Sequence, residues 1–230
     1  MLRVGVEKKG GRVSNFDTLI LFEGNIAAGK STIGRRLRAS GLFGFVEEPV
    51  NAWQEGFASN LLELFYQDPK RWSFTFQLAA FTTRAMTWSK LLKETEHRAV
   101  VLERSIYCDR YVFAENCYHR GLMTDTEWQL YCCLWDWLED AVWAEPDVIV
   151  YLRTPAHVCL KRIRERGREE EASLTLSYLR DLETLHDEWL LDNPDAIVLD
   201  GQREWTAEGI RDALLDHGMK LVTKRVQEAH

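Results

Sequence analysis

The segment LILFEGNIAAGKSTIGRRL, residues 19–37, constrains the fold more than any other part of the sequence. Residues 24–31 match the pattern G-x-x-x-x-G-K-[ST] between a short apolar run and a helical pattern, the context that this phosphate-binding motif requires. Small residues let backbone N–H groups close around phosphate oxygens at a helix N-terminus. The motif predicts a nucleotide-phosphate site formed by Gly24, Asn25, Ile26, Ala27, Ala28, Gly29, Lys30, Ser31 and Thr32.

Two side chains of this motif carry specific chemistry. Lys30 is expected to reach the outer phosphates, and the hydroxyl of Ser31 is expected to ligate Mg²⁺. The motif alone does not separate a GTPase, an ATPase motor, a nucleotide kinase and a nucleoside kinase. The choice depends on residues elsewhere in the chain.

Short aliphatic runs alternate with helical segments along the chain. Runs that do not alternate with polar residues are typical of strands buried on both faces of a parallel sheet. The expected strands are 19–22, 44–46, 100–102, 148–152 and 196–199, and the expected helices are 30–39, 56–66, 71–95, 106–120, 125–143, 155–166 and 174–191. This alternation predicts a three-layer α/β fold with a five-stranded parallel sheet. We expect a flexible leader over 1–17, one domain over 18–218 and a tail over 219–230.

Composition excludes several classes of protein. A net charge of −7 argues against nonspecific nucleic-acid binding, because such binders usually carry a positive excess. The five cysteines show no C-x-x-C spacing, which predicts reduced thiols rather than disulfides or zinc. No apolar run approaches the roughly 20 residues of a membrane span. We expect an intracellular, cytoplasmic protein that contacts neither membrane nor nucleic acid, with mitochondrial and nuclear locations left open.

Charged residues follow three of the predicted strands, where ligands bind in open α/β sheets. Glu47 and Glu48 follow the second strand, and either carboxylate could accept a proton from an attacking hydroxyl; they could equally be solvated. Glu103 and Arg104 follow the third, as a Mg²⁺-side carboxylate and a phosphate-binding guanidinium or as a structural ion pair. After the fourth strand and its helix, five cations occupy residues 161–168, which suits a lid over phosphates or a solvated helix end.

Aromatic side chains and one long apolar helix each have two interpretations. Six aromatics could stack on a planar base or belong to the core: Trp53, Phe65, Tyr66, Phe76, Tyr107 and Phe113. Gln77 could hydrogen-bond the edge of that base. The segment 127–143 is apolar nearly all round, which either core burial or a homodimer contact would explain. We favour the homodimer.

Taken together, these segments resemble the deoxyribonucleoside kinases. EGNIAAGKST, EEPVNAW, RWSFTFQ, ERSIYCDRYVFAEN, IVYLRTPAHVCLKRIRERGREEE and LSYLRDLETLHDEWL occur in that family's order and spacing, over roughly residues 19–200. The resemblance implies a P-loop kinase fold with an Arg-rich lid at about 162–172. It also implies transfer of the γ-phosphate of ATP or another NTP, with Mg²⁺, to the 5′-hydroxyl of a deoxynucleoside in nucleotide salvage.

The resemblance also assigns roles to single residues. Glu48 is implied as the general base, steadied by Arg104, and Glu103 as the Mg²⁺-side carboxylate beside Ser31. Gln77 is implied to pair with the base edge in a slot walled by Trp53 and Phe113, and Phe65 and Phe76 are further candidates for binding the substrate. Tyr66 and Glu171 are implied to bind the sugar 3′-hydroxyl, and Arg162, Arg166 and Arg168 to cover the phosphates. The donor adenine is expected near residues 200–205.

Two further positions bear on specificity. Arg84 and Asp109 resemble the deoxycytidine and deoxyguanosine kinase pattern, which predicts that deoxycytidine, deoxyadenosine or deoxyguanosine is preferred to thymidine. Cys108 stands where the family often has Ser. The main alternative is a nucleoside-monophosphate kinase similar to thymidylate kinase, which would need extra cations beside the acceptor phosphate. A GTPase switch is disfavoured, because the sequence has no N-K-x-D guanine-binding motif.

Overall fold

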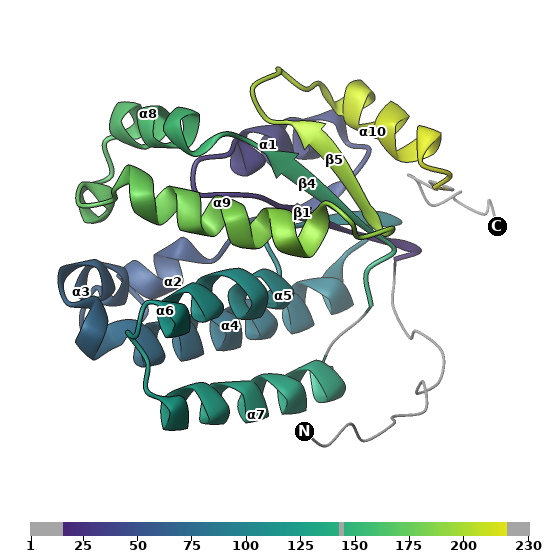
Figure 1. The fold of residues 1–230 in the computed structure, drawn as a ribbon. Helices are drawn as coiled ribbons and strands as arrows, with labels where there is room; N and C mark the ends of the chain where they lie inside the picture. The colour runs from purple at the N-terminus through teal and green to yellow at the C-terminus, as the bar shows by residue number, and fades with distance from the viewer. Residues whose placement is uncertain (1–15, 143–144, 220–230) are drawn as a thin grey trace.

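Five short strands form one parallel sheet in the computed structural model, which describes residues 16–142 and 145–219 (Figure 1). The sheet order is β2-β3-β1-β4-β5, and all neighbouring pairs are parallel. The strands are β1 (Thr18–Glu23), β2 (Gly44–Val46), β3 (Ala99–Glu103), β4 (Val148–Arg153) and β5 (Ala196–Asp200). The predicted α/β fold with a five-stranded parallel sheet is therefore confirmed.

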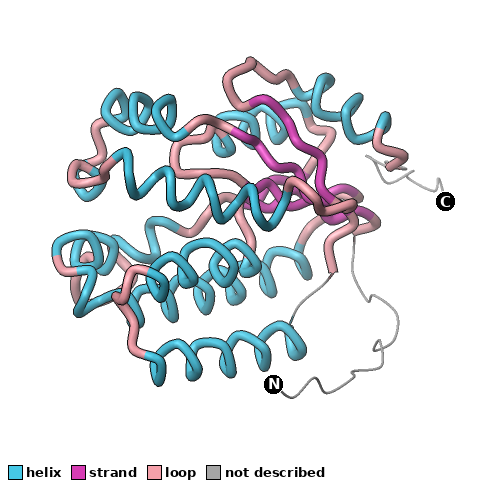
Figure 2. Tube along the Cα trace, viewed as in Figure 1, coloured by secondary structure: helices cyan, strands magenta, loops and turns pink. Residues whose placement is uncertain are grey.

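Helices cover both faces of this sheet (Figure 2). One face packs against α1 (Lys30–Ser40), α8 (Ala156–Arg166) and α10 (Ala207–Asp216), which contribute residues such as Leu37, Ile163 and Ile210 to the core. The other face packs against α4 (Pro69–Glu94) and α9 (Leu176–Leu190) through Trp88 and Leu190. Because both faces are covered, the strands contain the continuous apolar runs seen in the sequence.

A second apolar core lies away from the sheet. It joins α4 to α2 (Val50–Gln54), α3 (Leu61–Gln67), α6 (Glu115–His119) and α7 (Asp125–Val142). Tyr131 of α7 meets Phe81 of α4 edge-on, and the indole of Trp135 donates to the carbonyl oxygen of Ile106 at 2.8 Å. The exposed side of α7 carries Trp137, which is 66% exposed. Core burial thus explains only one side of this apolar helix.

The predicted helix 56–66 is wrong over its first half. Only its second half is helical, in α3, and residues 55–60 separate α3 from α2, a short helix that was not predicted. A Cβ at Gly56 would lie 2.5 Å from the carbonyl oxygen of Ala52, so glycine permits the close turn that ends α2. The side chain of Asn60 then accepts from the Glu63 N–H and starts α3.

The remaining helix predictions need smaller corrections. The segment predicted as 106–120 consists of α5 (Ile106–Cys108), a π-helical turn (Asp109–Ala114) and α6. Thr175 accepts from the Tyr178 N–H, so α9 begins after 174. Helix α10 was missed, although Thr206 caps it. Residues 1–15 of the predicted leader, 143, and 220–230 of the predicted tail lie outside the described residues. No helix that the structure describes combines the length and the apolar character that a membrane span requires.

Two helical glycines should respond in opposite ways to alanine. A Cβ at Gly34 of α1 would lie 1.9 Å from Cζ of Phe45, whereas the nearest atom to a Cβ at Gly209 of α10 is 3.4 Å away. Gly34→Ala should lower the free energy of unfolding by about 1–3 kcal/mol through overpacking. Gly209→Ala should raise it by up to about 1 kcal/mol through helix propensity. Urea denaturation measures both, and a Gly34→Ala variant as stable as wild type would contradict this packing.

Candidate active site

The phosphate-binding loop joins β1 to α1 and has the tight backbone that its glycines predict. Gly24 has a φ of 142°, and a Cβ there would lie 2.6 Å from the carbonyl oxygen of Leu152 on β4. The buried Nζ of Lys30 donates to the carbonyl oxygens of Gly24 and Asn25, at 2.9 Å each. Nδ2 of Asn25 donates to the carbonyl oxygen of Leu179 at 2.8 Å. The loop is therefore held between the sheet and α9.

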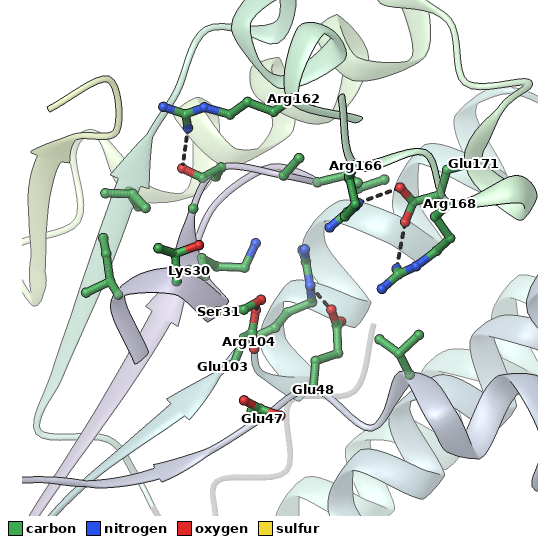
Figure 3. Close-up of a pocket in the computed structure, with 18 of the residues that line it drawn as sticks. Lys30, Ser31, Glu47, Glu48, Glu103, Arg104, Arg162, Arg166, Arg168 and Glu171 are labelled. Atoms are coloured by element: carbon green, nitrogen blue, oxygen red, sulfur yellow. Dashed lines mark hydrogen bonds and ion pairs between the residues drawn. The ribbon is translucent and has the colours of Figure 1, made fainter. Parts of the chain in front are cut away.

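A cavity of about 720 Å³ opens beside this loop, at the carboxyl ends of the strands. Figure 3 shows the loop, the strand-end carboxylates and the lid arginines around it. Apart from Gly24 and Asn25, every residue assigned to the site lines this cavity: Ile26, Ala27, Ala28, Gly29, Lys30, Ser31, Thr32, Glu48, Trp53, Phe65, Tyr66, Phe76, Gln77, Arg84, Glu103, Arg104, Asp109, Phe113, Arg162, Arg166, Arg168 and Glu171. Tyr107, one of the six candidate aromatics, does not line it and packs against Tyr111 and Trp135 instead. The structure thus brings together side chains from the whole length of the chain.

The two neighbouring glutamates after β2 have different surroundings. Oε1 of Glu48 accepts from Nη2 of Arg84 at 2.8 Å and pairs with Nε of Arg104 at 2.9 Å. Burial alone would raise the pKa of Glu48, but the charges of Arg104, Arg84 and Lys30 outweigh burial and lower that pKa to about 2. Glu47 pairs instead with the exposed Arg35, at 3.2 Å. Glu48 is therefore a fixed, ionised carboxylate, and Glu47 is a surface group.

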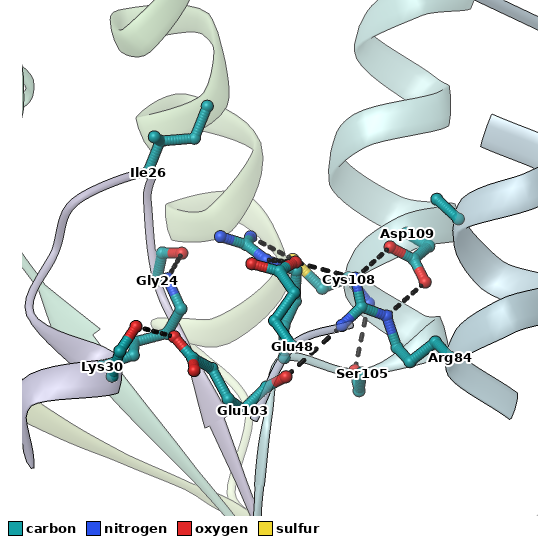
Figure 4. Close-up of polar contacts among 12 residues, drawn as sticks. Gly24, Ile26, Lys30, Glu48, Arg84, Glu103, Ser105, Cys108 and Asp109 are labelled. Carbon is teal, nitrogen blue, oxygen red and sulfur yellow. Dashed lines mark hydrogen bonds and ion pairs between the residues drawn. The ribbon is translucent and has the colours of Figure 1, made fainter. Parts of the chain in front are cut away.

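Arg84 connects this carboxylate to the position that was predicted to determine base preference. Its side chain is 1% exposed, and it holds Asp109 through Nε to Oδ2 at 2.8 Å and Nη2 to Oδ1 at 3.1 Å. The same Nη2 donates to Glu48 (Figure 4). One guanidinium therefore contacts both carboxylates, on the side of the cavity formed by α4 and the π-helical turn.

The Ser31 hydroxyl and the Glu103 carboxylate are adjacent oxygen groups in the cavity that could hold Mg²⁺. Oγ of Ser31 lies 2.5 Å from Oε1 of Glu103. No group of three or more metal-ligating side chains occurs among residues 16–142 and 145–219. Mg²⁺ in phosphoryl-transfer sites commonly uses one or two protein oxygens, and phosphates and water supply the rest. The hydroxyl and carboxylate present here fit that requirement.

An aromatic slot extends from Glu48 toward α3 and α4. The rings of Phe65 and Phe76 stack at 4.6 Å, and Trp53 meets Phe76 edge-on at 5.5 Å. Arg104 covers the ring of Phe113 at 4.4 Å. Gln77 is 1% exposed, and its Oε1 has no hydrogen-bond partner among the described residues. A buried amide oxygen of this kind is costly unless a ligand supplies a donor.

The lid contributes a carboxylate as well as cations. The carboxylate of Glu171, which is 4% exposed, pairs with Arg166 and, at 2.8 Å, with Arg168. Burial and the charges of Glu171 and Glu48 raise the pKa of the Tyr66 hydroxyl, which keeps it a neutral hydrogen-bond donor. The lid itself is attached to α2 and to the start of α3, because Oε1 of Glu170 accepts from the amides of Gln54 and Asn60.

Arg162 has a structural contact in addition to its place in the cavity. Its Nη1 donates to the carbonyl oxygen of Ala28, and its Nη2 donates to that of Gly201, both at 2.9 Å. Residues 201–205 line the same cavity beyond the phosphate-binding loop. The segment therefore lies beside the phosphate-binding loop, and binding of the donor adenine near residues 200–205 stays a prediction.

Several cavity residues were not identified from the sequence. They include Asn51, Leu62, Ala80 and Tyr178. Asn51 and Tyr178 fall inside two of the segments that carried the resemblance, EEPVNAW and LSYLRDLETLHDEWL. That proximity was an available signal, whereas nothing in the local pattern distinguishes Leu62 or Ala80 from ordinary core residues.

Comparisons with known proteins agree with a nucleotide-binding site of this kind. The sequence model of the deoxynucleoside kinase family matches residues 20–223. The chain is 40% identical to deoxycytidine kinase of Mus musculus over 194 residues, which is 75% of each protein. It is 39% identical to deoxycytidine kinase 1 of Xenopus laevis, over 74% of this chain and 73% of that protein. It is 38% identical to the mitochondrial deoxyguanosine kinase of Xenopus laevis, over 73% and 71%.

The predicted family and the predicted enzyme class are therefore confirmed. The family match covers well over half of the chain, and the relatives are matched over more than two thirds of their lengths. The protein is a phosphotransferase that uses a nucleotide as phosphate donor and acts on the hydroxyl of a small nucleoside. On these grounds the chain belongs to the deoxynucleoside kinase family.

Proposed function

We propose that this enzyme transfers the γ-phosphoryl group of ATP or another NTP to the 5′-hydroxyl of a deoxynucleoside, and that it prefers deoxycytidine, deoxyadenosine or deoxyguanosine to thymidine. The observation that carries the proposal is the position of Glu48. Its carboxylate is held by Arg84 and Arg104 in a cavity that the phosphate-binding loop and the aromatic slot share. A hydroxyl bound in the slot would point at the carboxylate and at the phosphates together.

In the proposed mechanism, positioning and charge account for most of the catalysis. Glu48 accepts a hydrogen bond from the 5′-hydroxyl and receives its proton late, as the bond to phosphorus forms. Such timing suits a carboxylate of low pKa, because the hydroxyl becomes acidic only when phosphoryl transfer is well advanced. Arg104 steadies both Glu48 and the 5′-oxygen.

Cationic groups would stabilise the charge on the transferred phosphoryl. Lys30 lies at the start of α1, and Arg166 and Arg168 face the cavity from the lid. Mg²⁺, when bound, neutralises charge on the donor phosphates, and the chain would hold it through Ser31 and Glu103.

Replacing Glu103 should raise the Mg²⁺ concentration that half-maximal activity requires.

The acceptor pocket supports an uncharged nucleoside. Oε1 of Gln77 is available to a base, and Tyr66 and Glu171 lie at the lid side, where a sugar hydroxyl would bind. Two buried cations line this pocket, Arg84 and Arg104. Both are paired with carboxylates, those of Glu48 and Asp109. A monophosphate kinase would need cations free to bind an acceptor phosphate, so that alternative is not favoured.

The base preference rests on Arg84 and Asp109. Their bidentate pair fills the deep end of the slot with charged groups, which leaves little room for the methyl group of thymine. The relatives with 38–40% identity carry the names deoxycytidine kinase and deoxyguanosine kinase, which supports the same preference.

We also propose a homodimer, formed through the exposed side of α7 and the neighbouring part of α4. Trp137 is 66% exposed, Met86 67% and Leu130 49%, which is unusual for large apolar side chains. A monomeric mass in light scattering would contradict this proposal.

Residues 18–218 would form the kinase domain of each subunit, and the enzyme would act in the cytoplasm.

Glu48→Gln should lower turnover by about 10²–10⁴-fold, because it removes the proton acceptor. The Michaelis constant for the nucleoside should change much less, since the amide still fills the same space. Glu47→Gln is the matched control and should leave turnover within about threefold. Steady-state kinetics with deoxycytidine and ATP measures both variants, and near-normal turnover of Glu48→Gln would refute the assigned role.

The pH dependence follows from the lowered pKa of Glu48. Because that pKa is about 2 in the folded enzyme, Glu48 stays ionised throughout pH 5–8. Protonation of Glu48 would remove activity only as the pH falls toward 2, so it should produce no acid limb in kcat/KM between pH 8 and pH 5. A pH–rate profile with deoxycytidine tests this, and an acid limb near pH 6 that is absent from Glu48→Gln would contradict it.

Replacing Arg84 and Asp109 together, by Met and Ala, should raise the activity with thymidine relative to deoxycytidine. The double variant should also lose turnover with deoxycytidine, because Glu48 loses one of its two guanidinium partners. Rates with the four deoxynucleosides, measured for wild type and variant, check both effects. Thymidine as the best substrate of the wild type would overturn the proposed preference.

A further inference from the structure

Arg104 has an unusual backbone and a second set of contacts on the side away from Glu48. Its φ is 65°, in the left-handed region that a non-glycine residue rarely adopts. Such a conformation costs on the order of 1–3 kcal/mol and persists only where surrounding contacts impose it. The Arg104 N–H donates to the carbonyl oxygen of Phe22 at 2.8 Å, which fixes the main chain. The guanidinium needs further contacts to hold its direction.

Those contacts form a buried chain that ends on α9. Nη1 of Arg104 donates to Sγ of Cys108 at 3.4 Å, and the same sulfur lies 3.4 Å from Nε2 of His186. Nδ1 of His186 lies 2.7 Å from the carbonyl oxygen of Leu182. Cys108 and His186 are each 0% exposed. Cys108 is drawn with Glu48 and Arg84 in Figure 4, beside the cluster that it supports.

The direction of each hydrogen bond in this chain is determined. A carbonyl oxygen only accepts, so Nδ1 of His186 carries a proton. Burial and the charge of Arg104 lower the pKa of His186 to about 3, so the ring is neutral and Nε2 is an acceptor. Burial raises the pKa of the Cys108 thiol, which therefore keeps its proton and donates it to Nε2. The sulfur lone pairs remain to accept from Arg104.

A competing carboxylate makes this support relevant to catalysis. Glu23, the last residue of β1, is 0% exposed. Burial raises the pKa of Glu23 to about 7, although a hydrogen bond from Ser105 and the charges of Arg104 and Arg84 act in the opposite direction. When it is ionised, Glu23 attracts Arg104 from the end of β1, whereas Glu48 attracts it from the cavity. A guanidinium between two carboxylates needs a fixed third contact if it is to stay on one of them.

We propose that Cys108 and His186 are positioning residues for catalysis, which hold Arg104 on Glu48 rather than on Glu23. This inference rests on the proposed roles of Glu48 and Arg104. These hydrogen bonds end on α9, through His186. The carbonyl oxygen of Leu179 on the same helix accepts from Asn25 of the phosphate-binding loop. A single helix thus sets the donor loop and the acceptor-side arginine relative to each other.

Paired variants of Cys108 test the proposal. Cys108→Ala removes the link to Arg104 and should lower kcat at least tenfold, with the Michaelis constant for deoxycytidine within threefold of wild type. Cys108→Ser retains a donor and an acceptor at this position and should keep kcat within threefold. A purely structural role would not produce this split, because both substitutions reduce the volume of the same buried side chain.

His186 and a second buried cysteine complete the experiment. His186→Leu should lower kcat as Cys108→Ala does. The kcat of the double variant should fall no further than that of the more impaired single variant, because both substitutions break the same series of hydrogen bonds. Cys159→Ala is the matched control. Cys159 is buried in α8 and takes no part in the hydrogen bonds between Arg104, Cys108 and His186, so kcat should not change. Thermal melting identifies any variant that fails to fold.

The outcomes separate this inference from the proposed function. If the wild type does not phosphorylate deoxynucleosides, or if Glu48→Gln is fully active, the proposed function fails. If those two results are as expected but Cys108→Ala keeps kcat within threefold of wild type, the positioning role is refuted alone. Loss of activity in Cys108→Ser equal to that in Cys108→Ala would also refute it, since the hydrogen bonds would then be irrelevant.

Discussion

The carboxylate of Glu48 between two buried guanidinium groups is the interaction on which the rest of the site depends. Arg84 is 1% exposed and Arg104 4% exposed, and each would carry a large desolvation penalty if unpaired. Glu48 and Asp109 supply two negative charges to these two cations. Both guanidinium groups therefore have carboxylate partners without any ligand. A preorganised arrangement of this kind contributes to catalysis because little reorganisation remains for the reaction itself.

In the proposed mechanism, the sharing of Arg84 would couple substrate choice to catalysis. Nη2 of Arg84 contacts both Asp109, the residue proposed to select the base, and Glu48, the residue proposed to accept the proton of the 5′-hydroxyl. A base that disturbs the Arg84–Asp109 pair would also move one of the two partners of Glu48. A poor fit at the base can therefore reduce turnover as well as affinity. Changing the base preference by substitution should for the same reason carry a cost in rate.

Helix α9 links parts of the active site that lie far apart in the chain. Leu179 holds the phosphate-binding loop through Asn25, and His186 is linked to Arg104 through Cys108. The lid precedes this helix in the chain, and Glu170 of the lid accepts a hydrogen bond from Gln54 of α2. The donor side, the acceptor side and the lid thus share one support. The contacts that α9 makes through Leu179 and His186 are not indicated by any local sequence motif.

The sequence by itself determined the strands, the phosphate-binding loop, the family and most of the charged and aromatic residues of the cavity. Local patterns suffice for these, because a buried parallel strand and a phosphate-binding turn each need particular residue types at fixed spacing. Only the tertiary structure decided that Glu48 is held by two buried arginines whereas Glu47 pairs with an exposed one. It alone decided that Arg84 contacts two carboxylates and that Cys108 meets His186, 78 residues away. It also corrected the helix over 56–66 and showed that α7 buries only one side. Such pairings depend on how distant elements pack, and the free energy of burying a charge is decided by partners that the local sequence does not contain.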